Sequence, residues 1–139
     1  MGLGREINYS RRVRWSDCDV AGIWRFTAAL TYTEEAEAEL LREAGVLPEL
    51  YRYLVRVYVD AQFRRPAVFD DFVTVRLRLL RLGRSSLHYE YGILCEDETA
   101  AFGRFSAVYV QDSGKAQPLP EQARQRLEAW FGGRSINVE

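Results

Sequence analysis

The alternation of apolar and polar residues near the start of the chain predicts a β-strand. Ile7, Tyr9, Val13 and Trp15 fall on one face of an extended segment that covers 7–15. A glycine-containing loop of about ten residues follows this segment and leads to the longest helical pattern in the sequence. The first part of the chain is therefore expected to run from a strand through a loop into a helix.

Residues 27–44 contain strong helix formers and neither glycine nor proline, which predicts one long helix. Thr27 is the expected N-cap, and Gly45 is the expected stop. An apolar stripe is formed by Ala29, Tyr32, Ala36 and Leu40. The acidic residues Glu34, Glu37 and Glu39 are expected to lie largely outside that stripe.

After this helix the alternation has a period of two, which predicts four more strands at about 55–64, 73–80, 87–93 and 102–110. A short amphipathic helix is expected at 120–131. The element order predicts an α+β fold in which a five-stranded curved antiparallel sheet packs around one long helix. One helix covers only one face of the sheet. The other face and the sheet edges need a partner to cover them, so at least a dimer is expected.

The 139 residues fit a single domain, 1–139, and 47% of them are hydrophobic, which is enough for a core. No apolar run is long enough to cross a bilayer, and the first residues lack the pattern of a signal peptide, so we expect a cytoplasmic protein. The net charge of −1 gives no field that would attract nucleic acid or an acidic membrane, and neither is expected as a partner.

Several kinds of active site are excluded by the residues that they require. Neither a Gly-x-Ser-x-Gly elbow nor a phosphate-binding Gly-x-x-x-x-Gly-Lys loop occurs, and the only histidine, His88, is expected on the polar side of a strand. Cys18 and Cys95 are expected to be free thiols. A calcium loop starting at Asp17 would have Ala21 and Ala28 at ligand positions, so no metal is expected.

Two aspartates, Asp17 and Asp19, remain as candidate catalytic residues on the loop before the long helix. A carboxylate can attack a carbonyl carbon directly, or it can take a proton from an attacking water. The free N–H groups at a helix start can stabilise the oxyanion that develops. The spacing of the two residues also fits simple turn capping, and the sequence leaves both interpretations open.

The segment Trp15-Ser16-Asp17-Cys18-Asp19-Val20-Ala21-Gly22-Ile23, followed by a glutamate-rich helix, resembles the 4-hydroxybenzoyl-CoA thioesterase family of hotdog-fold acyl-CoA thioesterases. The segment 61–71 is similar to the second strand and turn of that family. The resemblance implies the hotdog fold and hydrolysis of an acyl-CoA thioester to a carboxylic acid and free coenzyme A. It implies no separate cofactor, because coenzyme A is part of the substrate.

The resemblance also assigns roles to individual residues of the loop. Asp19 matches the second aspartate of the family's segment, which is the catalytic nucleophile or general base. Asp17 matches the first aspartate, to which we assign a supporting part in shaping the loop. The backbone N–H of Phe26 matches the oxyanion donor, and Gly22 matches the loop glycine. Relatives often have tyrosine at the position of Phe26 and, in one branch, histidine at that of Thr27. Another branch uses a carboxylate of the helix, for which Glu34 and Glu35 are the candidates.

The expected substrate contacts are Gly22, Ile23, Trp24, Phe63, Arg64, Arg65 and Arg84, with the arginines (Arg81 included) near predicted strand ends where they could meet phosphates. Arg25 could pair with Asp19, or it could simply be solvated. The expected assembly is a homodimer or a homotetramer. A non-catalytic acyl-CoA-binding hotdog protein is the alternative function, and a hotdog dehydratase is disfavoured because His88 lies in the wrong element.

Overall fold

The structure is a computed structural model that describes residues 5–112 and 114–132. Its strands are β1 (Glu6–Arg12), β2 (Leu54–Val59), β3 (Gln62–Phe63), β4 (Phe72–Leu82), β5 (Ser86–Cys95) and β6 (Glu98–Tyr109). Its helices are α1 (Phe26–Ala44), α2 (Leu47–Leu50) and α3 (Glu121–Trp130), with 3-10 turns η1 (Trp15–Asp17) and η2 (Tyr51–Tyr53). No described helix is both long and apolar enough to span a membrane.

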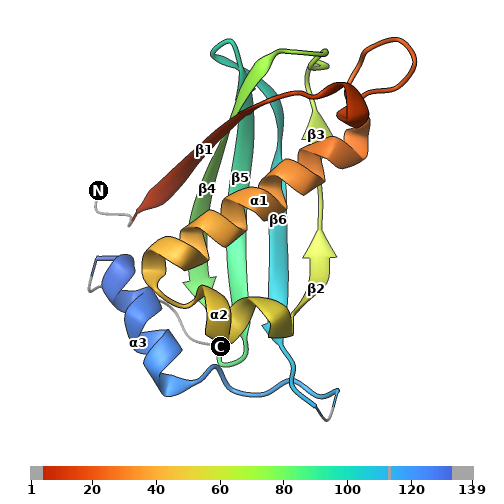
Figure 1. The fold of residues 1–139 in the computed structure, drawn as a ribbon. Coiled ribbons are helices and arrows are strands. Elements are labelled where there is room, and N and C mark those ends of the chain that lie inside the picture. The colour runs from red at the N-terminus through yellow and green to blue at the C-terminus, as the bar shows by residue number, and fades with distance from the viewer. Residues whose placement is uncertain (1–4, 113, 133–139) are drawn as a thin grey trace.

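The strands form one curved antiparallel sheet, and α1 crosses one of its faces (Figure 1). The strand order is β1-β4-β5-β6-β2, and β3 also pairs with β6. Strands β2 and β3 together replace the single strand that was predicted over 55–64, so the five-stranded sheet is confirmed with its fifth strand divided. α3 packs near the C-terminal end of α1. The fold is the predicted hotdog fold.

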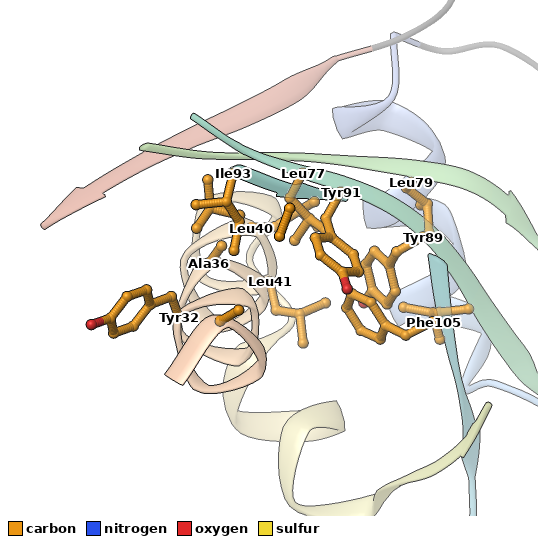
Figure 2. Close-up of a cluster of buried hydrophobic side chains, with 14 of the residues drawn as sticks. Tyr32, Ala36, Leu40, Leu41, Leu77, Leu79, Tyr89, Tyr91, Ile93 and Phe105 are labelled. Carbon is orange, nitrogen blue, oxygen red and sulfur yellow. The ribbon is translucent and has the colours of Figure 1, made fainter. Parts of the chain in front are cut away.

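The core lies between α1 and the inner face of the sheet. Figure 2 shows Ala36, Leu40 and Leu41 of α1 beside side chains of the central strands, whereas the Tyr32 ring extends away from them. The predicted apolar stripe of α1 is confirmed, since its four residues are completely buried. Every second residue of β4 and β5 is buried, as expected for strands with one face covered.

A close backbone contact explains why the fifth strand is divided. A Cβ atom added at Gly103 would lie 2.2 Å from the carbonyl oxygen of Asp60, so the backbone between β2 and β3 crosses directly over this glycine. The same carbonyl accepts a hydrogen bond from the hydroxyl of Tyr91 at 2.8 Å. The Asp60 carboxylate accepts one from the N–H of Arg104 at 3.0 Å. The side chain thus replaces a regular ladder contact at the break.

Two predicted boundaries are wrong. The first strand ends at Arg12 rather than Trp15, because Trp15 begins the 3-10 turn η1. α1 begins at Phe26 with Arg25 as its N-cap, so Thr27 lies inside the helix. The sequence patterns also missed α2 and η2. Gly45 is confirmed as the stop, with a positive φ of 82° and its N–H bonded to the carbonyl of Arg42.

Candidate functional site: the aspartate loop and the start of helix α1

The aspartate loop, residues 17–22, lies at the end of the sheet where β3 pairs with β6 and where α1 begins (Figure 1). The loop is docked on the segment before β4. The carbonyl of Gly22 accepts a hydrogen bond from the N–H of Phe69 at 2.8 Å, and Ile23 forms a bridge with Val68. Gly22 has a φ of +78°, which favours glycine at this position. The loop is therefore fixed to the body of the sheet.

Asp17 is held from three sides by hydrogen bonds to one carboxylate oxygen. Its Oδ2 accepts bonds from Nη2 of Arg11 at 2.9 Å, from the hydroxyl of Tyr32 at 2.7 Å and from the N–H of Arg14 at 2.9 Å. Burial acts to raise the pKa of Asp17, but the Arg14 N–H, the Tyr32 hydroxyl and the Arg11 charge outweigh it, and the pKa is lowered. Asp17 is therefore ionised and anchors the loop to β1 and α1.

Arg11 extends this anchor to a second carboxylate. Its Nη1 donates to both oxygens of Glu35 at 2.8 and 2.9 Å, and its guanidinium lies 4.2 Å from the ring centroid of Tyr32. The hydroxyl of Tyr9 donates to Glu35 at 2.7 Å. We refer to Tyr9, Arg11, Asp17, Tyr32 and Glu35 as the Asp17 cluster. Because Glu35 is occupied within the cluster, it is poorly placed to act as a helix carboxylate on a substrate.

Asp19 has one carboxylate oxygen engaged and one available. Its Oδ1 accepts hydrogen bonds from the N–H groups of Ala21 at 2.9 Å and Ile23 at 3.2 Å, as in a capped turn. Its Oδ2 makes no hydrogen bond within the described part of the chain, and the residue is exposed. The capping interpretation and the chemical one are thus compatible, because each needs a different oxygen.

The start of α1 is joined to the loop through backbone hydrogen bonds. The N–H of Arg25 donates to the carbonyl of Asp17 at 2.8 Å, which puts the next residue, Phe26, at the first helical position. The N–H of Phe26 donates to none of the described residues, as is usual in a first helical turn. Arg25 neither pairs with Asp19 nor is simply solvated, because its guanidinium donates to the carbonyls of Cys18 and Ser16.

The structure brings some of the expected substrate contacts to this end of the sheet. Trp24 is buried and lies edge-on to the exposed Phe63, with 6.3 Å between the ring centroids. Arg64 lies over the ring of Phe102, and Arg65 forms an ion pair with Glu98 at 2.5 Å. Within one chain Arg84 is not brought near these residues.

Arg84 lies in the turn between β4 and β5, whereas the aspartate loop is at the other end of β4. The eleven residues of β4 separate the two ends by roughly 36 Å at ~3.3 Å per residue. Arg81 of β4 lies opposite His88 of β5 in the strand register, near the same distant turn. The arginines that the sequence placed together near strand ends are therefore at two different ends.

The thiols and the histidine do not form a second reactive centre here. Burial and then the charges of Asp17 and Asp19 raise the pKa of the Cys18 thiol, so Cys18 is a poor nucleophile. His88 lies between the hydroxyls of Ser86 and Ser106, each 2.9 Å from a ring nitrogen. Among the described residues no group of three or more His, Cys, Asp or Glu side chains is arranged to hold a metal ion.

Two features of the site were missed in the sequence. Arg11 occupies the place between Tyr9 and Val13 on the otherwise apolar face of the first strand, and a charge on such a face is the signal that could have identified it. Glu37 was expected outside the buried stripe but is fully buried and forms a bidentate ion pair with Arg56 of β2. Its spacing of four residues from Thr33 and Leu41, both buried, was the available signal.

The fold and this loop define a hotdog-fold protein with an aspartate-bearing loop at the start of its long helix. The chain belongs to the thioesterase-like superfamily, whose family model matches residues 13–127. It is 30% identical to a 1,4-dihydroxy-2-naphthoyl-CoA hydrolase of Synechococcus sp. (strain CC9605), covering 92% of this chain and 93% of the relative.

Solved structures agree with this family. A thioesterase from Thermus thermophilus, complexed with coenzyme A and zinc, is 30% identical with a TM-score of 0.80, covering 93% of this chain and 96% of that one. A gentisyl-coenzyme A thioesterase is 26% identical with a TM-score of 0.75, covering 87% and 98%. The chain is therefore a thioester hydrolase.

Proposed function

We propose that this protein is an acyl-CoA thioesterase in which Asp19 is the catalytic residue. The observation that carries the proposal is that the two oxygens of the Asp19 carboxylate differ in their hydrogen bonding. Oδ1 is fixed by two backbone N–H groups, while Oδ2 has no partner among the described residues. A carboxylate that is held in place yet retains a free oxygen is suited to act as a nucleophile or as a general base.

In the nucleophilic route, Oδ2 forms a bond to the thioester carbonyl carbon, and the electron pair of the carbonyl moves onto its oxygen. The N–H of Phe26 and the positive end of the α1 dipole stabilise this oxyanion. The carbon–sulfur bond then breaks, coenzyme A leaves as a thiolate that takes a proton from water, and a second water hydrolyses the anhydride. In the general-base route, Asp19 takes a proton from water as that water attacks the carbonyl carbon. The carbon–sulfur bond then breaks, and the proton held by Asp19 passes to the leaving coenzyme A thiolate.

The remaining contacts have supporting roles in this proposal. Asp17 keeps the loop and the helix start in register through its carboxylate and its carbonyl. Ile23, Trp24 and Phe63 provide apolar surface beside Asp19, and Gly22 permits the positive φ of the loop. Arg64 and Arg65, at the same end of the sheet, are the candidates for the phosphates of coenzyme A.

The proposal is tested by measuring free-thiol release from a panel of short, long and aromatic acyl-CoA esters, with the acid product identified by mass spectrometry. Release of thiol and acid in equal amounts from at least one ester is the expected result. Tight binding of acyl-CoA without release from any ester would favour the ligand-binding alternative. In that case Phe26, which lacks the hydroxyl that relatives often carry at this position, would be the first residue to replace.

We further propose a homodimer, supported by the exposed edge of the sheet at β2. Val55, Val57 and Val59 are 49%, 58% and 53% exposed in the single chain, and nothing among the described residues pairs with the outer side of β2. An apolar, unpaired edge strand favours association with a second strand. Light scattering should show a dimer for the wild type or a tetramer built from it, and Val57→Glu should shift the protein to monomers. A monomeric wild type would refute the proposal.

A further inference from the structure

A cavity of about 220 Å³ opens between α1 and the sheet on the side of β2 and β6. Leu30 and Thr33 line it from the helix, and Val59, Tyr91 and Phe105 line it from the sheet. The Thr33 hydroxyl is bonded within the helix to the carbonyl of Ala29 at 2.8 Å. Figure 2 shows the rings of Tyr91 and Phe105 together beside α1. Their centroids are 6.2 Å apart. This lining suits an apolar ligand group.

The cavity follows the helix face that begins at the proposed oxyanion donor. Phe26, Leu30 and Glu34 are spaced by four residues and therefore lie on one face of α1. With a rise of ~1.5 Å per residue, Leu30 is about 6 Å and Glu34 about 12 Å along the axis from Phe26. An acyl group whose carbonyl oxygen meets the N–H of Phe26 can thus extend its far end into this cavity.

Among the described residues that line the cavity, the charged side chains leave no cation free for an acidic ligand. Both oxygens of the fully buried Glu37 are bonded to the guanidinium of Arg56, whose Nε also lies 3.7 Å from Glu34. The guanidinium stacks on Phe105 at 5.5 Å from its centroid. Two carboxylates therefore surround one arginine. A further carboxylate brought into the cavity would meet a net negative charge and an apolar wall.

We propose that this cavity is the acyl-binding site and that it selects uncharged apolar acyl groups over acyl groups with a distal carboxylate, with Leu30 and Glu34 as specificity-determining residues. The inference rests on the proposed acyl-CoA thioesterase function. At ~30 Å³ per water-sized group, the cavity has room for about seven such groups, so an aryl ring or a chain of roughly six to eight carbons fills it.

The test compares hexanoyl-CoA with adipoyl-CoA, which has the same chain length and a distal carboxylate, and uses acetyl-CoA as an ester too short to fill the cavity. We expect kcat/KM for hexanoyl-CoA to exceed that for adipoyl-CoA at least ~30-fold, and Glu34→Gln to reduce this ratio at least ~5-fold. Leu30→Trp, which places a bulky ring in the cavity and obstructs it, should lower hydrolysis of hexanoyl-CoA at least ~10-fold and spare that of acetyl-CoA. Thr31→Trp, on the exposed side of the same helix, is the control and should leave the ratios unchanged.

Equal rates for hexanoyl-CoA and adipoyl-CoA would overturn the inference, as would a Leu30→Trp protein that loses all three activities equally while remaining folded by circular dichroism. If the wild type hydrolyses none of the esters, the proposed function fails, and binding of the same esters then tests the cavity by calorimetry. Hexanoyl-CoA should then bind more tightly than adipoyl-CoA and lose that advantage in Leu30→Trp. Equal binding of the two esters would refute the cavity assignment independently.

Discussion

Replacing Tyr32 with phenylalanine removes one hydrogen bond from Asp17 and leaves the rest of the Asp17 cluster in place. The lost hydroxyl donates to Oδ2 at 2.7 Å, while the ring that remains is fully buried and lies under the guanidinium of Arg11. Asp17 would keep its bonds from Arg11 and from the N–H of Arg14. The variant therefore isolates the contribution of a single hydroxyl group.

The expected loss follows from the charge and burial of the acceptor. A hydrogen bond to a charged group contributes about 1.5–3 kcal/mol, and the Asp17 side chain is only 19% exposed, so water replaces the hydroxyl poorly. We expect the free energy of unfolding at pH 7 to fall by about 2 kcal/mol. Because the Asp17 carbonyl also holds the N–H of Arg25, kcat should fall roughly tenfold with little change in KM.

The pH dependence of the stability difference between wild type and Tyr32→Phe provides a second, independent test of the role of Asp17. The pKa of Asp17 is lowered in the folded protein, so its stabilising effect is complete above the unfolded pKa of about 3.9 and is lost as pH falls through the folded pKa. In Tyr32→Phe the pKa of Asp17 is lowered less, because the Tyr32 hydroxyl is one of the groups that lower it. The difference in stability between wild type and variant should therefore be largest near neutral pH and shrink below about pH 4.

Urea unfolding at fixed protein concentration, from pH 7 down to pH 3.5, measures the stability, and thiol release measures kcat and KM. Tyr9→Phe is the matched control, because it removes a hydroxyl of the same cluster that donates to Glu35 and not to Asp17. It should leave kcat unchanged. A stability difference for Tyr32→Phe that is independent of pH, or an equal loss of kcat in both variants, would refute the assigned role of Asp17.

Substitutions at three further positions test other parts of the structure. Arg56→Ala leaves Glu37 buried without its partner and should cost about 3–5 kcal/mol at pH 7 in urea unfolding. Because burial raises the pKa of Glu37, this cost should shrink as pH falls toward the unfolded pKa of about 4.3; a cost that grows instead would contradict the burial argument. Gly22→Ala forces a side chain into a φ of +78° and should lower the free energy of unfolding by about 1 kcal/mol, measured by thermal melts. Gly22→Asn should lower it less in the same experiment, because asparagine adopts a positive φ more readily. Gly103→Ala places a Cβ against the carbonyl of Asp60 and should reduce stability by about 1–3 kcal/mol, and an unchanged melting temperature would show that the crossing is looser than described.

The features that could be predicted from the sequence are those set by local periodicity. Alternation identified β4 and β5, and the stripe of Ala29, Tyr32, Ala36 and Leu40 identified the buried face of α1. Gly45 was recognised as the stop because a helix end with a positive φ favours glycine. The motif around Asp19 was found because its residues are adjacent in the chain.

The features that could not be predicted depend on residues far apart in the sequence. The break between β2 and β3 arises where Asp60 crosses Gly103, and neither residue alone signals it. The burial of Glu37 depends on Arg56 in another element. The partners of Arg25 are carbonyls rather than Asp19, and carbonyl acceptors carry no residue-specific signal.

The most direct test of the role of Asp19 is the effect of Asp19→Asn on kcat/KM for the best ester in the thiol-release panel. The substitution keeps the size of the side chain and an oxygen able to accept the Ala21 and Ile23 N–H bonds, but removes the charged oxygen. Asp70→Asn is the matched control, since Asp70 is an exposed aspartate of the neighbouring turn whose positive φ of 73° asparagine also adopts.

We predict a fall in kcat/KM of at least ~100-fold for Asp19→Asn, with folding and assembly retained, and no significant change for Asp70→Asn. Near wild-type hydrolysis by folded Asp19→Asn would contradict the central claim that Asp19 carries the reaction.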